Sequence, residues 1–328
     1  MKTIHLDTSA PLLPPCVATI GFFDGVHLGH RHLIEQVKAE ARRAGLASAV
    51  VTFATHPRQV VSAGYVPQLL TSLPQKLELL AQTGVDEAVV LPFDRCMAAL
   101  SAHDFMHDIL KRRIAAATLI TGYDNRFGHN RAEGFADYVR YGAEMGMRVV
   151  QGEALTVDGV NVSSSVIRRL LNEGCAADAA RFLGRRYTIG GRVERGFQEG
   201  RRMGFPTANI APSLPEQLIP KCGAYAARLR IGQGEWLPAM INVGDCPTFG
   251  RTRLTIEAHI IGFTADIYGA TVTAEFVRRL RGERRFDGEE ALKAQLCADR
   301  RMTLDILNET EDNRYGTKRK DVNEKSLY

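Results

Sequence analysis

Short apolar runs alternate with longer amphipathic stretches between residues 16 and 153, and this alternation constrains the fold more than any other feature. Each apolar run is rich in Val, Ile and Ala and is short enough for a buried strand. The runs are "CVATIGFF", "LASAVVTF", "DEAVVLPF", "AATLITG" and "MRVVQGE". The stretches between them include "HRHLIEQVKAEARRAG", "LPQKLELLAQTG" and "GFADYVRYGAEMG", each closed by a glycine typical of a helix end. This order predicts a doubly wound parallel α/β sheet.

The pattern changes after about residue 184 to alternating strands separated by Gly-rich turns. These strands are "YTIGGRVERG", "GAYAARLRIGQGEWLPAMINVG", "LTIEAHIIGF" and "TVTAEFVRRL", and a helical period follows in "DGEEALKAQLCADRRMTLDILNE". Such an order predicts a small antiparallel β-barrel domain with a C-terminal helix. We therefore predict one domain at 1–183, a second at 184–310 and a disordered polar tail at 311–328.

Composition narrows the class of protein. The chain of 328 residues has room for two domains, and 45% hydrophobic with 24% charged residues excludes a disordered or fibrous protein. A net charge of +5 suits phosphate-bearing ligands and nucleic acid alike. The six cysteines form no C-x-x-C pair, which favours reduced thiols over disulfides or a zinc site. No apolar run approaches the roughly 18 residues of a membrane span, and no signal peptide is evident, so we expect a cytoplasmic protein.

The stretch "ATIGFFDGVHLGHR" at 18–31 lies where the first long apolar run gives way to a helix. In doubly wound sheets, ligands bind at the carboxyl ends of strands. His27 and His30 are three residues apart and share one face of a helical turn, and Gly29 between them leaves room for a phosphate. Two imidazoles at a helix N-terminus predict an anion site, with helix-capping histidines as the alternative.

A second motif, "NVSSSVIRRLL", places Ser163, Ser164 and Ser165 before a helical pattern, with Arg168 one turn inside. The serines alone fit an ordinary N-cap, whereas a capped helix that also carries arginine is suited to polyphosphate. Together with H-x-G-H, this motif resembles the nucleotidyltransferase superfamily. The resemblance implies that the histidines meet the phosphates of ATP and that the serine/arginine helix holds the departing pyrophosphate.

Between these motifs lies "TGYDNRFGHNRAEGF". In combination with "GFFDGVHLGH" and "SSSVIRRLL" it resembles the FMN adenylyltransferase module of bacterial FAD synthetases. The resemblance implies that Asp124, Asn125 and Arg126 bind the flavin. It also implies a nucleotide-binding set in this half of the chain, consisting of Gly21, Phe22, Asp24, Gly25, Gly29, Ser163, Ser164, Ser165 and Arg168.

The second half contains "GRVERGFQEGRRMGFPTANI", in which regularly spaced glycines permit close backbone approach to a nucleotide or serve hairpin turns. The P-T-A-N run resembles riboflavin kinases. The resemblance implies that Gly196 and Gly204 bind the nucleotide and that Thr207 and Asn209 hold Mg²⁺.

Alternation in "LTIEAHII" places Glu257 on the polar face of a strand, where periodicity alone makes it a solvent residue. The resemblance to riboflavin kinases instead implies that Glu257 is the general base. The segments "NVGDCPTFG", "DIYG" and "LRGERRF" also resemble that family, which implies that Arg281 lies near the flavin.

Nearly the whole chain except the tail resembles the bifunctional riboflavin kinase/FMN adenylyltransferase family. The resemblance implies that ATP phosphorylates riboflavin to FMN, with Glu257 as base, and then adenylylates FMN to FAD and pyrophosphate, with His27 and His30 as paired donors. ATP, Mg²⁺ and the flavins riboflavin, FMN and FAD are the expected ligands. We expect no nucleic-acid or membrane partner, and the sequence leaves the oligomeric state open.

Three alternatives remain at this point. A single-activity nucleotidyltransferase shares H-x-G-H but does not account for the P-T-A-N barrel on the same chain. A flavin- or RNA-binding protein with degenerate sites predicts broken motifs, whereas the motif residues are present. A zinc enzyme would use His103 and His107, spaced i, i+4 on a predicted helix, but no third ligand is evident.

Overall fold

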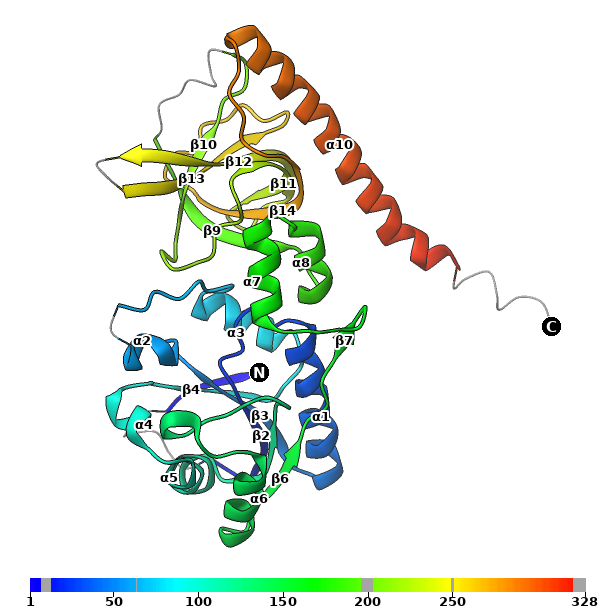
Figure 1. Cartoon of the computed structure of the whole chain (residues 1–328). Helices are drawn as coiled ribbons and strands as arrows, with labels where there is room; N and C mark the ends of the chain where they lie inside the picture. Colours follow the sequence, from blue (N-terminus) through cyan, green and yellow to red (C-terminus); the bar gives the residue numbers. More distant parts are fainter. Residues whose placement is uncertain (7–12, 63, 196–202, 249–250, 321–328) are drawn as a thin grey trace, which may run out of the picture. The chain divides into compact units, whose positions relative to one another are not determined.

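The computed structural model describes residues 1–6, 13–62, 64–195, 203–248 and 251–320 (Figure 1). Contacts between residues divide the chain into two compact units, which we call the first unit (Met1–Ser164) and the second unit (Ser165–Tyr328).

The first unit is built on a six-stranded sheet with the order β1-β4-β3-β2-β5-β6, in which all neighbouring strands are parallel. The predicted doubly wound parallel sheet is confirmed. The N-terminal edge strand β1 was not predicted from the sequence, because its four residues include only one buried side chain. The strands are β1 Lys2–His5, β2 Cys16–Ile20, β3 Ala47–Phe53, β4 Glu87–Leu91, β5 Ala116–Thr121 and β6 Arg148–Gln151.

Helices cover both faces of this sheet and bury two separate cores. Val17 and Ala18 of β2 belong to opposite cores, as the alternation of side chains along a strand requires. One core includes side chains of α1 and α3, and the other includes side chains of η1 and α6. The main helices are α1 Leu28–Ala44, α3 Leu73–Ala81, the π-helix η1 Phe105–Arg113 and α6 Phe135–Glu144. Shorter elements are α2 Pro57–Val61, α4 Arg95–Ala99, α5 Ala102–Asp104, η2 His129–Arg131, β7 Thr156–Val157 and β8 Val160–Asn161.

The second unit contains a closed antiparallel barrel with the strand order β10-β13-β12-β11-β14-β9, followed by the long helix α10. The predicted barrel and terminal helix are confirmed. Strand β10 begins inside the P-T-A-N run, which is not among the strands predicted from the sequence. The elements are α7 Ser164–Glu173, α8 Ala176–Leu183, β9 Tyr187–Glu194, β10 Ala208–Pro212, β11 Gly223–Ile231, β12 Trp236–Thr248, β13 Arg251–Ile260, β14 Thr271–Arg281 and α10 Glu289–Lys320.

The compact units and helix α10 end at other residues than the predicted domains, whose boundaries stay predictions. Helix α8 contacts β9 and β14, and the Lys221 N–H donates to the Leu171 carbonyl of α7 at 3.0 Å, so both helices pack with the barrel. The compact units therefore divide at Ser164/Ser165, and the domain boundary at 184 stays a prediction. Helix α10 continues to Lys320, past the start of the predicted disordered tail, because extending an established helix costs less than nucleating one. Residues 321–328 lie outside the described residues.

We expect the fragment 165–328 to be more stable than the fragment 184–328. The shorter fragment lacks α8, which buries Phe182 and Leu183 at 8% and 0% exposure. Burying one such side chain contributes roughly 1.5–3 kcal/mol. For a unit of this size, losing them should lower the midpoint of thermal unfolding by roughly 5 °C or more. Circular dichroism melting of both fragments measures this, and equal melting temperatures would contradict it.

Candidate active sites

His27 and His30 lie together at the start of α1. The Nδ1 atom of His27 accepts the backbone N–H of His30 at 3.2 Å and so caps the helix. The two imidazole rings stack with centroids 3.6 Å apart and planes inclined by 15°. Because Nδ1 of His27 accepts a hydrogen bond, the ring proton of the neutral tautomer sits on Nε2 and makes that atom a donor. The His27 side chain can therefore cap the helix through Nδ1 and still donate to an anion through Nε2.

The loop leading to these histidines has an unusual backbone. Phe23 and Val26 have φ values of 53° and 38°, and Gly25 has 81°. The left-handed region disfavours side chains with a Cβ, at a cost of roughly 1–3 kcal/mol for each residue, so other contacts must hold this shape. Such strain is typical of a loop whose geometry serves a ligand.

Asp24 supplies the main contacts that hold the loop. Its buried carboxylate accepts the N–H of Leu70 at 2.9 and 3.0 Å, the N–H of Thr71 at 3.1 Å and the Thr71 hydroxyl at 3.3 Å. The Gly25 N–H donates to Thr71 Oγ1 at 3.1 Å. The carboxylate of Asp24 is therefore engaged by the protein itself, and its predicted contribution to nucleotide binding would be indirect, through the loop.

The serine motif reaches the same loop. Ser164 Oγ donates to the backbone carbonyl of Asp24 at 2.9 Å. A Cβ on Gly29 would approach the Val162 carbonyl to 3.0 Å and the His27 ring to 3.3 Å. Gly29 is thus needed for the close passage of the chain before α7, a reason that the sequence did not reveal.

Three other members of the predicted nucleotide set lie in or just before α7. Ser163 is half-buried, Ser165 is exposed, and Arg168 is half-buried in α7. Ser165 and Arg168 belong to the second unit. Gly21, at the other end of the set, donates its N–H to the Val51 carbonyl at 3.0 Å and so continues the pairing of β2 with β3.

The predicted flavin segment follows β5. Asp124 and Arg126 are exposed, and Asn125 is half-buried. The Asn125 amide donates to the Ile20 carbonyl at the end of β2 at 2.6 Å. This bond brings the segment next to the His27 loop, and it also means that the amide is engaged within the protein.

Lys76 of α3 was not recognised from the sequence. It is 2% exposed, and its Nζ donates to the Phe22 carbonyl, the Thr52 hydroxyl and the Phe53 carbonyl at 3.0, 3.1 and 2.9 Å. Burial lowers the pKa of Lys76 to about 8, against the opposing effect of Asp24. The available signal was its position four residues before the buried Leu80, on the apolar face of the helix.

In the second unit, four oxygen-bearing side chains form one row across the barrel. Asn209 of β10 pairs with Glu194 of β9 and with Glu257 of β13, and Glu257 pairs with Asn242 of β12. Paired residues of antiparallel strands share a face, with Cβ atoms about 4.5–5.5 Å apart. The adjacent residues along β10 and β13 are buried, so the row lies on the outer face of the barrel. Amide and carboxylate oxygens in such a row suit Mg²⁺.

A cavity of about 340 Å³ is lined by Val193, Ala208 and Ala258, the buried residues that alternate along the strands with those of the row. Thr207, just before β10, and the loop 263–268 with Asp266 and Tyr268 also line it. Its volume is within the range of small-molecule sites. The segment "DIYG" begins in this loop, and none of its residues is among the predicted site residues.

His259 fixes the segment that carries Thr207. Its Nδ1 lies 2.9 Å from the Pro206 carbonyl, and its ring packs against Phe205 at 5.1 Å. Burial lowers the pKa of His259, with the hydrogen bond to Pro206 opposing this effect. Since a carbonyl can only accept, Nδ1 is the protonated ring nitrogen in this contact.

Arg281 forms an ion pair with Asp299 of α10. Its Nε and a terminal nitrogen lie 3.0 and 2.9 Å from the Asp299 carboxylate, which is 2% exposed. The pair links α10 to the end of β14.

A second cavity of about 610 Å³ is lined by Arg284, Phe286 and neighbouring residues. Gly204 has a φ of 80°, and Gly196 lies outside the described residues.

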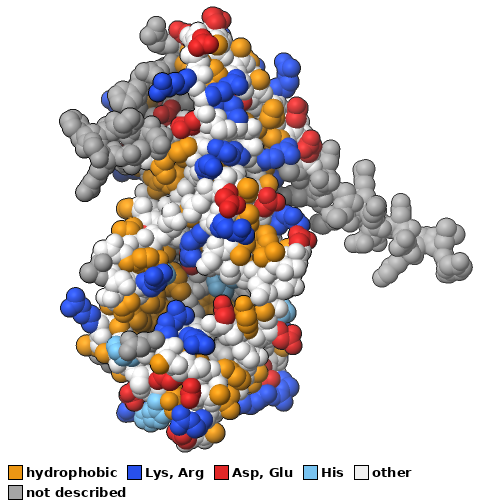
Figure 2. Space-filling model, viewed as in Figure 1, with side chains coloured by type: hydrophobic (Ala, Val, Ile, Leu, Met, Phe, Trp, Pro, Cys, Tyr) orange, Lys and Arg blue, Asp and Glu red, His pale blue; other side chains and the backbone are white. Residues whose placement is uncertain are grey.

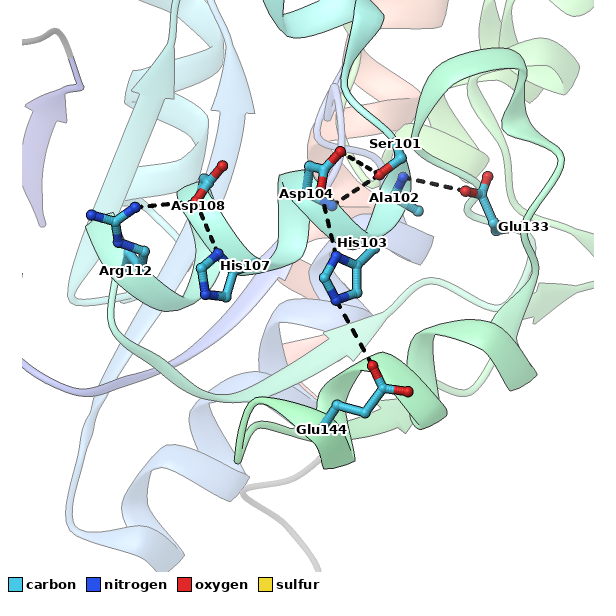
Figure 3. A network of polar contacts seen from close by, with 9 residues as sticks. All are labelled: Ser101, Ala102, His103, Asp104, His107, Asp108, Arg112, Glu133 and Glu144. Atoms are coloured by element: carbon cyan, nitrogen blue, oxygen red, sulfur yellow. Dashed lines mark hydrogen bonds and ion pairs between the residues drawn. The ribbon is translucent and has the colours of Figure 1, made fainter.

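The histidines of the zinc alternative belong to the first unit, and their side chains are 44% and 48% exposed (Figure 3). His103 contacts Asp104 and Glu144 at 3.5 and 3.8 Å, and His107 contacts Asp108 at 2.9 Å. The predicted helix is present here, as a short α-helical turn continued by the π-helix η1. Within the described part of the chain, no group of three His, Cys, Asp or Glu residues is arranged to hold a metal ion.

Two further observations concern the charged side chains of the surface and the apolar character of the helices. On the face that Figure 2 shows, Lys and Arg side chains are interspersed with Asp and Glu. Among the described residues, no helix combines the length and apolar character needed to span a bilayer.

Comparisons with known proteins place both halves in one family. Residues 10–166 match the FAD synthetase family, and residues 183–307 match the riboflavin kinase family. The chain is 36% identical to the bifunctional riboflavin kinase/FMN adenylyltransferase of Escherichia coli strain K12 over 91% of this chain and 95% of that protein. It is 33% identical to the Bacillus subtilis protein of the same name, over 93% and 98%.

A solved structure agrees with this assignment of the fold. The crystal structure titled as a macrolide-efflux protein from Streptococcus pneumoniae superimposes with a TM-score of 0.83 at 28% identity, covering 92% of this chain and 99% of that one. With both family matches and relatives of this identity over nearly their full length, the chain belongs to the bifunctional riboflavin kinase/FMN adenylyltransferase family.

Proposed function

We propose that this protein phosphorylates riboflavin with ATP to give FMN and then adenylylates FMN with a second ATP to give FAD and pyrophosphate. The observation that carries this proposal is the presence on one chain of two complete residue sets, the capped His27–His30 pair after β2 and the Asn209–Glu257 pair on the barrel. A single-activity nucleotidyltransferase leaves the second set without a purpose.

In the kinase reaction, the ribityl 5′-hydroxyl of riboflavin attacks the γ-phosphorus of ATP, and ADP leaves. Glu257 accepts the hydroxyl proton as the new P–O bond forms, since an alcohol is otherwise a poor nucleophile. Glu257 is half-buried and lies next to Asn209 in register, which supports its proposed role as base. The cavity beside Thr207 would hold ATP.

The oxygen-bearing row fits a magnesium ion. Thr207 and Asn209 would hold Mg²⁺, and when bound the ion neutralises charge on the phosphates. His259 keeps the Thr207 segment in place through its bond to the Pro206 carbonyl. Gly204, in the left-handed conformation, lets the chain turn into this segment beside the nucleotide.

In the adenylyl transfer, the phosphate of FMN attacks the α-phosphorus of ATP, and the bond to the β-phosphate breaks to release pyrophosphate. FMN is already an anion, so the protein needs no nucleophile of its own. His27, through Nε2–H, and His30 donate to the phosphates, where the N-terminus of α1 also favours negative charge. Ser164 would contact the leaving pyrophosphate, and Arg168 stays a predicted nucleotide-binding residue.

The remaining assignments follow the same scheme. Asp124, Asn125 and Arg126 would contact the flavin of FMN, with Asn125 acting mainly through its bond to Ile20. Arg281 would border the flavin of the kinase half, where its pair with Asp299 fixes α10. We further propose a cytoplasmic enzyme whose partners are small molecules and not nucleic acid.

Incubation of the purified protein with riboflavin, ATP and Mg²⁺ tests the proposal. FMN is expected first and FAD later, because the second reaction consumes the product of the first. A chelator added at the start should suppress both products, because the phosphates of ATP then lack their counter-ion. Chromatography of the flavins over time measures this. No flavin product with Mg²⁺ present would refute an enzyme, and FAD from supplied FMN alone would support a single-activity nucleotidyltransferase.

A further inference from the structure

Lys76 is a buried ammonium group that the proposed reactions do not use directly. It projects from the second turn of α3 and is 2% exposed. An ammonium has three N–H donors, and those of Lys76 meet three protein acceptors within 3.1 Å. Because all three are engaged, Lys76 has none left to donate to a phosphate.

The acceptors lie at the ends of two neighbouring strands. The Phe53 carbonyl ends β3, and the Phe22 carbonyl follows β2 by two residues. The hydroxyl of Thr52 donates to the same Phe22 carbonyl at 3.1 Å and accepts from Lys76. Lys76 therefore ties the carboxyl ends of β2 and β3 to α3, at the edge of the sheet where ligands bind.

Phe22 is also the residue at which the strained loop begins. The left-handed Phe23 follows it, and the loop then runs to the His27 cap. The Phe22 ring lies over the ammonium, with Nζ 4.1 Å from the ring centroid. Lys76 thus contacts both the backbone carbonyl and the ring of Phe22, the first residue of the loop.

The segment before α3 contacts the same loop at a second residue, Asp24. Leu70 and Thr71 bind the carboxylate of Asp24, and Ser72 caps α3 in a capping box with Gln75. One continuous segment, residues 70–76, therefore fixes the loop both at Phe22 and at Asp24. Asp24 carries the charge that opposes the effect of burial on Lys76.

We propose that Lys76 is a positioning residue for adenylyl transfer: it fixes the end of β2 so that the loop presents His27 and His30 to the phosphates of ATP. This inference rests on the proposed function of the first unit. It assigns no contact between Lys76 and substrate.

Lys76→Met tests the inference, because methionine fills a similar space without the ammonium. We expect kcat for FAD formation from FMN to fall about 100-fold, as a misplacement near 1 Å can produce. The KM for ATP should change much less than kcat, because the loss is in alignment and not in ground-state binding. Riboflavin phosphorylation by the same sample should continue and serves as an internal control.

Lys38→Met is the matched control within the first unit. Lys38 of α1 donates to the Thr83 carbonyl at 2.6 Å and to Glu35 at 2.7 Å. These partners lie apart from the acceptors of Lys76, so FAD formation should stay within about twofold of the unsubstituted protein. Loss of stability alone would be relieved by sucrose, whereas the loss of alignment should persist in it.

Thr52→Val and Thr52→Ser provide a second test if Lys76→Met does not fold. Valine removes one acceptor of the ammonium at nearly constant volume and should lower kcat for FAD formation roughly tenfold. Serine keeps the hydroxyl, so Thr52→Ser should retain most of the kcat for FAD formation. Equal kcat in these two variants, or unchanged kcat in Lys76→Met, would overturn the inference. Absence of FAD formation by the unsubstituted protein would instead refute the proposed function.

Discussion

Substitution of Glu257 by Gln is expected to abolish most FMN formation from riboflavin while leaving adenylylation of supplied FMN intact. Glutamine keeps the shape of the side chain but cannot accept the hydroxyl proton. General-base catalysis commonly contributes about 100- to 10,000-fold, so kcat for the kinase reaction should fall within that range. The two reactions are measured separately, with riboflavin and then FMN as the only flavin supplied.

Glu235→Gln is the control for this substitution. Glu235 is exposed in the turn between β11 and β12, so the same chemical change there should leave both reactions unaffected. Glu257 lies instead on the outer face of the barrel, in register with Asn209. If Glu257→Gln retains kinase activity similar to that of Glu235→Gln, another group serves as the base.

Two substitutions of His27 are expected to separate its two contacts. Asparagine places a polar atom near the position of Nδ1 and is a good N-cap, so His27→Asn should keep the stability of α1 and lose the Nε2 donor. Loss of one preorganised donor typically costs on the order of 100- to 1000-fold in rate. FAD formation from FMN should fall by that factor, with the melting temperature close to that of the unsubstituted protein.

Glutamine at the same position has the opposite effect. Its amide nitrogen reaches toward the position of Nε2, but glutamine is a poor cap, so His27→Gln should lose about 1 kcal/mol of stability and keep more activity than His27→Asn. His30→Ala should also lower FAD formation steeply without affecting the kinase. Calorimetry measures the stability of the two His27 variants, and flavin chromatography measures their rate of FAD formation. An active His27→Asn protein would refute the donor role of Nε2.

Local sequence patterns predicted most of the regular structure. Helix α1 illustrates why, because its apolar period, its capping histidine and the left-handed Gly45 at its end all lie within one short segment. The π-helical form of η1 could not be predicted in this way, since an i, i+4 spacing of histidines is compatible with either helix type. Strand β1 is defined by pairing with β4, far along the chain.

The candidate sites could be predicted only in part. His27, His30 and Glu257 stand in recognisable motifs, and the resemblance of those motifs to a known family indicated them. Asp24 and Arg281 were predicted to bind ligands, but their charged groups are engaged by Thr71 and Asp299, partners distant in sequence. A motif identifies which residues are present at a site, and it does not show which of their atoms remain available.

The α/β and barrel architecture and the family could be predicted from the sequence, because hydrophobic period and short motifs are properties of neighbouring residues. Tertiary packing, by contrast, was needed to bring Asn209 and Glu257 side by side, because their proximity depends on the register between two strands of the barrel. It likewise decided the role of Lys76, which resembles any helix lysine until the packing of α3 buries it. A buried ammonium is stable only where acceptors surround it, and the ends of β2 and β3 provide them.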